Sequence, residues 1–171
     1  MRRRDDLIGS KLRSVLATLC LILSPLASAV SIDDWLSETH EGRLYKTNMG
    51  ECVLENGQVI EACRLTFRTY GRLAPDLSNI VLMPTWLNGN AEGLSTYNYL
   101  SPDGIVDTDD YFVIAVNALG NGSSSSPSNS AQRPFPRFTI RDQVSLQHQL
   151  LTEHLDIQHL HAVVCLLYTS D

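Results

Sequence analysis

The chain has 171 residues, a length that leaves room for one ordinary globular domain. Hydrophobic residues make up 43% and charged residues 19%, a richer apolar content than that of disordered chains. The formal net charge is −6, and no cluster of Lys and Arg lies outside the N-terminus. Because proteins that neutralise phosphates need such clusters, we expect no nucleic acid among the partners of this chain.

Residues 1–29 are predicted to be a secretory signal peptide. Several Lys and Arg side chains precede an apolar run from Val15 to Leu26, and Ala27-Ser28-Ala29 follows it. A basic region, a short apolar core and an A-x-A site are the parts of a cleavable signal. An uncleaved anchor or a buried helix would leave the A-x-A site unexplained, and the run is short of the roughly 20 apolar residues that span a bilayer. We predict cleavage after Ala29, a periplasmic or secreted protein without a stable membrane span, and a domain over residues 30–164.

Cys52 and Cys63 are candidates for a disulfide, because exported proteins meet an oxidising compartment. Asn56-Gly57 lies between them and is a strong signal for a two-residue hairpin turn. That turn places Cys52 opposite Glu61 and leaves Cys63 diagonal to Cys52 on the same face. The diagonal of about 7 to 8 Å exceeds the disulfide range of about 4.4 to 6.8 Å. A bulge is then needed for the bond, and two buried free thiols are the alternative.

Four segments have the patterns of β-strands. Residues 64–70 alternate apolar and polar side chains, as in a half-buried strand. Residues 79–83 and 111–116 are continuous apolar runs, which are typical of strands buried on both faces. A third buried strand is expected to begin within residues 159–164.

One longer segment, residues 139–155, has the pattern of a helix. Thr139 and Asp142 have the spacing of a capping box, with Asp in place of the usual Glu. The expected inward face follows 3.6-residue spacing and consists of Ile140, Val144, Gln147, Leu151 and Leu155. A hairpin followed by buried strands and a strand-helix-strand unit predicts an α/β fold with parallel strands at the centre of the sheet.

Two connections, residues 84–110 and 117–138, are longer than the roughly 12 to 15 residues of an ordinary loop, so each is functional or disordered. The composition of residues 122–128 is that of a flexible linker. Ser123 to Ser126 offer hydroxyl nucleophiles, but no partner histidine is apparent, and structural contacts within the loop are the favoured interpretation.

The second connection carries a longer pattern, Asn-Ala-Leu-Gly-Asn-Gly-Ser-Ser-Ser-Ser-Pro-Ser-Asn over residues 117–129. With Thr69-Tyr70-Gly71-Arg72-Leu73 before it and Phe135-Pro136-Arg137-Phe138-Thr139 after it, this pattern resembles the homoserine O-acetyltransferase family of the α/β-hydrolase fold. The similarity extends over about residues 48–164. It implies the N-terminal half of an α/β-hydrolase sheet, in which an antiparallel hairpin leads into parallel strands with crossover helices.

The resemblance also implies a place for the oxyanion hole, the group of N–H donors that stabilises a negatively charged reaction intermediate. In the family, the segment after the first buried strand reads His-x-Leu-x-Gly, whereas here it is Pro84-Thr85-Trp86-Leu87-Asn88-Gly89. Trp86, Leu87 and Gly89 are therefore the candidates for the oxyanion hole or the pocket. A core aromatic role for Trp86 and a turn role for Gly89 are the alternatives. Thr85 at the histidine position resembles a side branch of the family more than the biosynthetic acetyltransferases.

The family has a nucleophile elbow, Gly-x-Ser-x-Gly, after the strand at residues 162–164. No such motif occurs in this chain, and Leu167 occupies the serine position. We expect no catalytic triad in this chain and no activity of the chain by itself. The tail over residues 165–171 is unlike the family, and we expect it to be translated adaptor or out-of-frame sequence joined to a gene fragment. Natural truncation or a diverged exon are the alternatives. His159-x-His161 has no third ligand of suitable spacing, so no metal site is predicted.

Two classes of function follow from these features. The first is an exported acyltransferase whose full-length form acts through an acyl-serine intermediate on small-molecule acyl donors and acceptors. It would use no cofactor, with acyl-CoA as a candidate co-substrate, and a secreted serine esterase of the same fold is the alternative within this class. The second is a small secreted binding module without catalysis.

Overall fold

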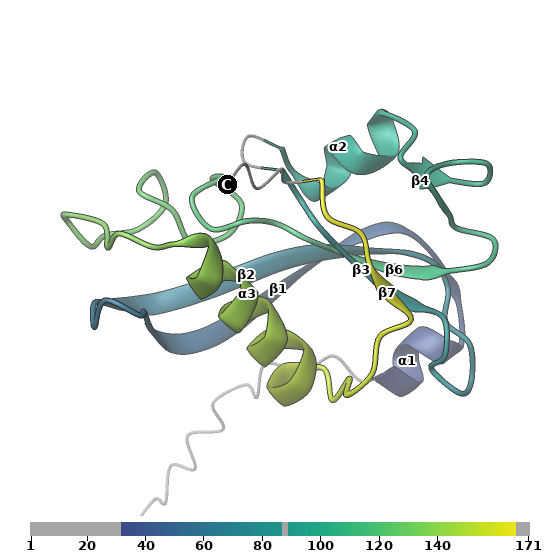
Figure 1. Cartoon of the computed structure of the whole chain (residues 1–171), viewed down its shortest axis with the longest axis horizontal. Coiled ribbons are helices and arrows are strands. Elements are labelled where there is room, and N and C mark those ends of the chain that lie inside the picture. Colours follow the sequence, from purple (N-terminus) through teal and green to yellow (C-terminus); the bar gives the residue numbers. More distant parts are fainter. Residues whose placement is uncertain (1–31, 87–88, 167–171) are drawn as a thin grey trace, which may run out of the picture.

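The computed structural model describes residues 32–86 and 89–166, which contain one mixed five-stranded sheet (Figure 1). Its strands are β1 (Thr39–Val53), β2 (Val59–Arg72), β6 (Phe112–Val116), β3 (Ile80–Pro84) and β7 (Ala162–Val163), in that spatial order. β1, β2 and β6 are antiparallel neighbours, while β6, β3 and β7 run parallel. The predicted signal peptide and most of the predicted tail lie outside the described residues.

Helices and a small parallel ribbon cover the two faces of the sheet (Figure 1). One face packs against α1 (Ile32–Leu36), α3 (Ile140–Gln149) and its π-helical continuation η1 (Leu150–His154). The other face packs against α2 (Ala91–Thr96) and the strands β4 (Leu100–Ser101) and β5 (Val106–Asp107). The predicted α/β architecture, with an antiparallel hairpin leading into parallel strands, is confirmed.

The hairpin between β1 and β2 has a longer turn than predicted. Val53 pairs with Val59, so five residues connect the strands, and Cys52 lies opposite Ile60 instead of Glu61. Two backbone hydrogen bonds define this turn: the Gly57 N–H donates to the Leu54 carbonyl and the Leu54 N–H donates to the Gln58 carbonyl, each at 2.9 Å. The prediction of a two-residue turn was therefore wrong, and the predicted partner of Cys52 was off by one position.

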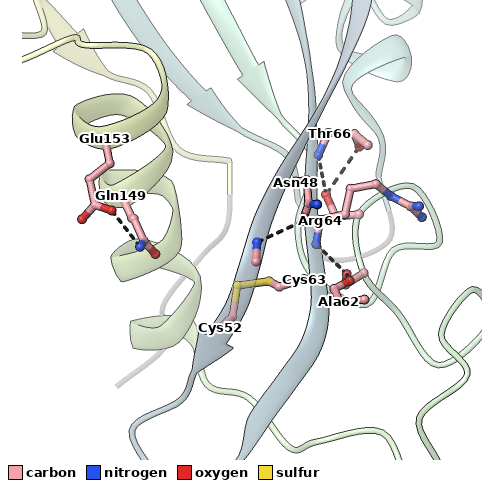
Figure 2. The surroundings of a disulfide bond; sticks show 11 residues. Asn48, Cys52, Ala62, Cys63, Arg64, Thr66, Gln149 and Glu153 are labelled. Atoms are coloured by element: carbon pink, nitrogen blue, oxygen red, sulfur yellow. Dashed lines mark hydrogen bonds between the residues drawn. A yellow bond between two sulfur atoms is a disulfide. The ribbon is translucent and has the colours of Figure 1, made fainter. Parts of the chain in front are cut away.

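A bulge in β1 places the two cysteines within bonding distance. The register shifts between Gly50 and Cys52, so that Gly50 lies opposite Cys63. The Cα atoms of Cys52 and Cys63 are 5.6 Å apart, and their sulfur atoms form a disulfide. Figure 2 shows this bond joining the neighbouring strands β1 and β2. Both cysteines are fully buried, which shields the bond from solvent.

Within residues 64–70 of β2 neither face is open to solvent, although Arg64 and Arg68 are only half-buried, whereas the alternation of its residues had predicted a half-buried strand. Thr66 and Tyr70, on the face expected to be open, are both buried. The Tyr70 hydroxyl donates to the Ala91 carbonyl of α2 at 2.9 Å, and the Thr66 N–H donates to Ser124 Oγ at 3.0 Å. Two segments distant in the sequence thus cover the second face, and they do so through polar contacts that hydrophobic periodicity does not register.

α3 begins where its capping box predicted, because Thr139 Oγ1 accepts from the Asp142 N–H and Asp142 Oδ2 accepts from the Thr139 N–H. Its expected inward face is partly wrong, since Ile140 is 48% exposed and Val144 is 59% exposed. The residues buried in α3 and η1 are Asp142, Leu146, Gln147, Leu150 and Leu151. Asp142 turns inward because its carboxylate binds backbone groups, and this rotation carries the apolar positions near the N-terminus toward solvent.

The predicted strand at residues 159–164 is reduced to Ala162–Val163. This short strand pairs with β3 at the edge of the sheet, and Val163 is 57% exposed. The expectation of a buried strand was therefore wrong for the described part of the chain, because no described residues pack over the outer side of Val163.

Candidate functional site

The two long connections leave the sheet side by side. β3 and β6 are parallel, so the segment 84–90 and the segment 117–129 both start at the carboxyl edge of these strands. Thr85 joins them: its N–H donates to the Val116 carbonyl at 3.0 Å, and its Oγ1 accepts from the Ala118 N–H at 3.1 Å. Open α/β sheets bind ligands at this edge. Thr85, at the family's histidine position, thus acts as a fully buried tie between the loops.

Two of the three predicted pocket residues form a tight turn. The Gly89 N–H donates to the Trp86 carbonyl at 3.0 Å, so this donor is engaged within the turn. A Cβ atom at Gly89 would lie 2.3 Å from the Trp86 indole, so only glycine allows the ring to lie against the backbone here. Among the described residues, no acceptor binds the backbone N–H of Trp86. Leu87, the third candidate, lies outside the described residues.

The Trp86 indole also belongs to an aromatic cluster with Tyr97 and Tyr99. Their ring centroids lie 6.0 Å and 6.3 Å from that of Trp86, and the two tyrosine rings are 6.2 Å apart. Trp86 packs partly buried against the core on the α2 side of the sheet, while Tyr97 is 63% exposed. The Trp86 ring therefore lies between the core on the α2 side of the sheet and the exposed Tyr97 ring.

Two asparagines that the sequence reasoning did not single out bind the backbone at Gly89 and Ala91. Asn117 Oδ1 accepts from the Ala91 N–H at 2.9 Å, and Asn117 Nδ2 donates to Thr66 Oγ1 at 3.0 Å. Asn121 Nδ2 donates to the Gly89 carbonyl at 3.1 Å and to Asn117 Oδ1 at 3.2 Å. Both residues stand in the family-like pattern after β6, which is the sequence signal that could have identified them.

The serine-rich segment, residues 122–129, forms a brace along β2, and the serines at its centre are buried. Ser124, Ser125 and Ser126 are buried, so the interpretation as a flexible linker was wrong and the alternative of structural contacts is confirmed. Ser124 Oγ donates to the Asn117 carbonyl at 2.9 Å and accepts from the Thr66 N–H. Ser125 Oγ accepts from the Arg64 N–H at 2.8 Å and donates to the Ala62 carbonyl at 3.4 Å, and Figure 2 shows Ala62 and Arg64 on β2 beside the disulfide. Hydroxyls engaged by backbone groups in this way are poor candidates for a nucleophile.

The remaining candidates bring no further chemistry together. His159 and His161 are both exposed, and the His161 ring lies 5.0 Å from the Tyr111 ring. Within residues 32–86 and 89–166, no group of three or more His, Cys, Asp or Glu side chains is arranged to hold a metal ion. Nor does any helix of that part of the chain have the length and apolar character needed to cross a membrane.

No protein-family model matches the chain. An ethyl acetate hydrolase from Pseudomonas veronii is 36% identical over 137 residues, which cover 78% of this chain and 39% of that protein. A homoserine O-acetyltransferase from Sulfurimonas autotrophica is 32% identical over 129 residues, covering 65% of this chain and 35% of that protein. The crystal structure of an acetylester hydrolase from Corynebacterium glutamicum is 38% identical, with a TM-score of 0.66 over 72% of this chain and 36% of that one. This chain is homologous to the esterases and homoserine O-acetyltransferases of the α/β-hydrolase fold.

The resemblance seen in the sequence is thus confirmed, and the mixed sheet is part of an α/β-hydrolase sheet. The chain spans 35 to 39% of the length of the two curated relatives described above. In α/β hydrolases, one oxyanion-hole donor comes from the loop after the third strand of the sheet. In this chain the connection that follows β3 begins at Thr85.

Proposed function

We propose that this chain forms the N-terminal part of an exported serine esterase that hydrolyses small, short-chain esters. The identity to an ethyl acetate hydrolase and to an acetylester hydrolase, at 36% and 38%, exceeds the 32% identity to the homoserine O-acetyltransferase from Sulfurimonas autotrophica. This difference is the observation that carries the proposal. Thr85 in place of the family's histidine supports the same direction.

The chemistry proposed for the whole enzyme is acyl transfer through a serine ester. A serine hydroxyl at a nucleophile elbow attacks the ester carbonyl, the alcohol leaves, and water releases the acid from the acyl-serine. The chain contains no Gly-x-Ser-x-Gly sequence, so the serine and its Asp and His partners are assigned to the rest of the whole protein. The family's serine position in this chain, Leu167, lies outside the described residues.

The contribution of this chain is proposed to be a donor for the oxyanion. The Gly89 N–H is engaged within its turn, so the Trp86 N–H and the backbone at Leu87 are the better candidates, and Gly89 instead shapes the turn. An N–H that points at the developing oxyanion lowers the barrier by about 3 to 4 kcal/mol. The Trp86, Tyr97 and Tyr99 rings, beside the same turn, would line the route for an apolar ester.

Export is the second part of the proposal. The signal-like segment at residues 1–29 and the Cys52–Cys63 disulfide support it, because disulfides persist in oxidising compartments. An exported enzyme has little access to acyl-CoA, which also favours water over an amino acid as acyl acceptor. Acetyl transfer from acetyl-CoA to homoserine is the competing activity within the same family.

The test compares the whole gene product and the 171-residue chain, each with one substitution variant, on two reactions. The whole gene product, with the native sequence after residue 164, is expected to hydrolyse short-chain p-nitrophenyl esters, and to show little acetyl transfer from acetyl-CoA to homoserine. Replacing its elbow serine with alanine should abolish the hydrolysis. The 171-residue chain should be inactive, and Leu167→Ser alone should not restore activity because the base is missing. Preferred transfer to homoserine by the whole gene product would overturn the hydrolase assignment. A gene that ends without an elbow would favour the binding module.

A further inference from the structure

Asn121 has four hydrogen bonds that join three separate segments. Its Nδ2 donates to the Gly89 carbonyl at 3.1 Å and to Asn117 Oδ1 at 3.2 Å. Its Oδ1 accepts from the N–H groups of Ser123 and Ser124 at 2.9 Å and 3.2 Å. The side-chain amide therefore connects the turn after β3, the end of β6 and the serine-rich brace.

The brace itself is fixed to the sheet, so a side chain that is bonded to it can hold the turn in a constant position. Ser124 is fully buried and bonds to the backbone of β2 and to the Asn117 carbonyl. Asn117 in turn holds the first residue of α2 through the Ala91 N–H. A displacement of Asn121 would thus be transmitted to both ends of the segment from Gly89 to Ala91, while the brace stays anchored to β2.

We infer that Asn121 is a positioning residue, which holds Gly89 at the carboxyl edge of the sheet and thereby fixes Trp86, the proposed oxyanion donor that Gly89 contacts. The inference rests on the proposed esterase activity for its kinetic consequence. The structural part of the inference, that the Asn121 side-chain amide restrains the turn, does not depend on that activity. Misplacing a catalytic group by about 1 Å can lower the rate about 100-fold.

The Asn121→Asp variant tests this role with almost no change in volume. The carboxylate keeps the acceptor for Ser123 and Ser124 but loses both donors, and it faces two oxygen atoms, the Gly89 carbonyl and Asn117 Oδ1. Repulsion between these atoms should release the turn from the brace.

Asn129→Asp is the matched control. Asn129 Nδ2 donates to the carbonyls of Gly122 and Ser124, each at 2.9 Å, and its Oδ1 accepts from the Ser126 N–H. The variant loses the same two donors from the same brace. None of these three hydrogen bonds of Asn129 reaches Gly89 or Ala91. A loss of activity caused only by loosening the brace would therefore be equal in both variants.

The experiment measures kinetics and amide hydrogen exchange in the whole gene product. Asn121→Asp is expected to lower kcat for a short-chain p-nitrophenyl ester about 10- to 100-fold with KM changed less than about threefold, whereas Asn129→Asp stays near the parent kcat. Exchange at the Gly89 and Ala91 amides should accelerate at least about tenfold in Asn121→Asp and not in Asn129→Asp.

Three outcomes would overturn the inference: unchanged exchange at Gly89 and Ala91, a kcat for Asn121→Asp within twofold of the parent, or equal losses in the two variants. An inactive parent protein would refute the proposed esterase function instead, and the exchange measurement would still decide whether Asn121 restrains the turn.

Discussion

The Asp142 carboxylate accepts a hydrogen bond of 2.8 Å from the backbone N–H of Glu55, which lies 87 residues earlier in the chain. The same carboxylate accepts from the N–H and hydroxyl of Thr139 as the cap of α3. Asp142 thus fastens the tip of the β1–β2 hairpin to the start of α3. Burial opposes ionisation of this group, but the hydrogen bonds from Glu55 and Thr139 together outweigh burial and lower its pKa.

Asp142→Asn is expected to lower the free energy of unfolding at pH 7 by about 2 kcal/mol, the order of a hydrogen bond to a charged group. As the folded pKa lies below the unfolded value, the unfolded chain binds the proton first. The stability from Asp142 is therefore complete above about pH 4 and lost as the pH falls below it. Urea denaturation between pH 2.5 and 7 measures this. Asp109→Asn, a change at an exposed carboxylate, is the control, and equal losses in both variants would contradict the prediction.

Loss of the disulfide should destabilise the hairpin. Cys52 and Cys63 are 11 residues apart, and a crosslink closing a loop of this size contributes about 3 kcal/mol through the unfolded state. The double variant Cys52→Ser, Cys63→Ser should lose about this amount in urea denaturation, and its stability should not respond to dithiothreitol. The Cys165→Ser variant leaves the bridge intact and should behave as the parent does. A parent stability that does not change on full reduction would contradict the prediction.

Export predicts a defined N-terminus. The Ala27-Ser28-Ala29 site should be cut after Ala29, so the mature protein begins at Val30. Intact-mass measurement of periplasmic material from a bacterial host tests this, and Ala29→Arg is expected to block the cleavage. A protein that retains Met1 and stays in the cytoplasm would refute the export proposal and leave the disulfide without an oxidising compartment.

The parts of the fold that could be predicted are those set by local apolar patterns. The continuous runs at β3 and β6 gave buried strands within one residue of their observed bounds, because few other structures bury such runs. The hairpin turn differed by one position because hydrogen bonds around Leu54 outweighed the usual preference of Asn56-Gly57. The face of α3 differed because a carboxylate, Asp142, occupies an inward position.

The brace and the two asparagines could not be predicted in the same way. Thr66 and Ser124 are 58 residues apart, and their contact is polar, so neither composition nor periodicity contains it. A serine-rich stretch is disordered when its hydroxyls bind water, and ordered when β2 offers backbone donors and acceptors to them. The family-like pattern located this region of the site, but the roles of Asn117 and Asn121 became visible only from their bonds.

His40 gives the remaining prediction, which concerns the N-terminal helix α1. Its Nε2 lies 3.3 Å from the Trp35 carbonyl and its Nδ1 lies 2.7 Å from Thr69 Oγ1. Because a carbonyl only accepts, Nε2 donates, and Nδ1 of the neutral ring accepts from the Thr69 hydroxyl. The ring also packs edge-on against Phe112, with centroids 5.1 Å apart. This buried neutral ring ties α1 to β2.

Acidification should therefore weaken the attachment of α1. Burial lowers the pKa of His40, and this effect outweighs the Trp35 carbonyl and the nearby Glu38, which favour the charged ring. The unfolded chain then takes up the proton first. The contribution of His40 to stability should be constant above about pH 6.5 and should fall as the pH drops from there toward the folded pKa. His40→Gln should remove this dependence in urea titrations between pH 5 and 8, while the exposed His148→Gln should retain it. A parent protein whose stability is flat across this range would contradict the prediction.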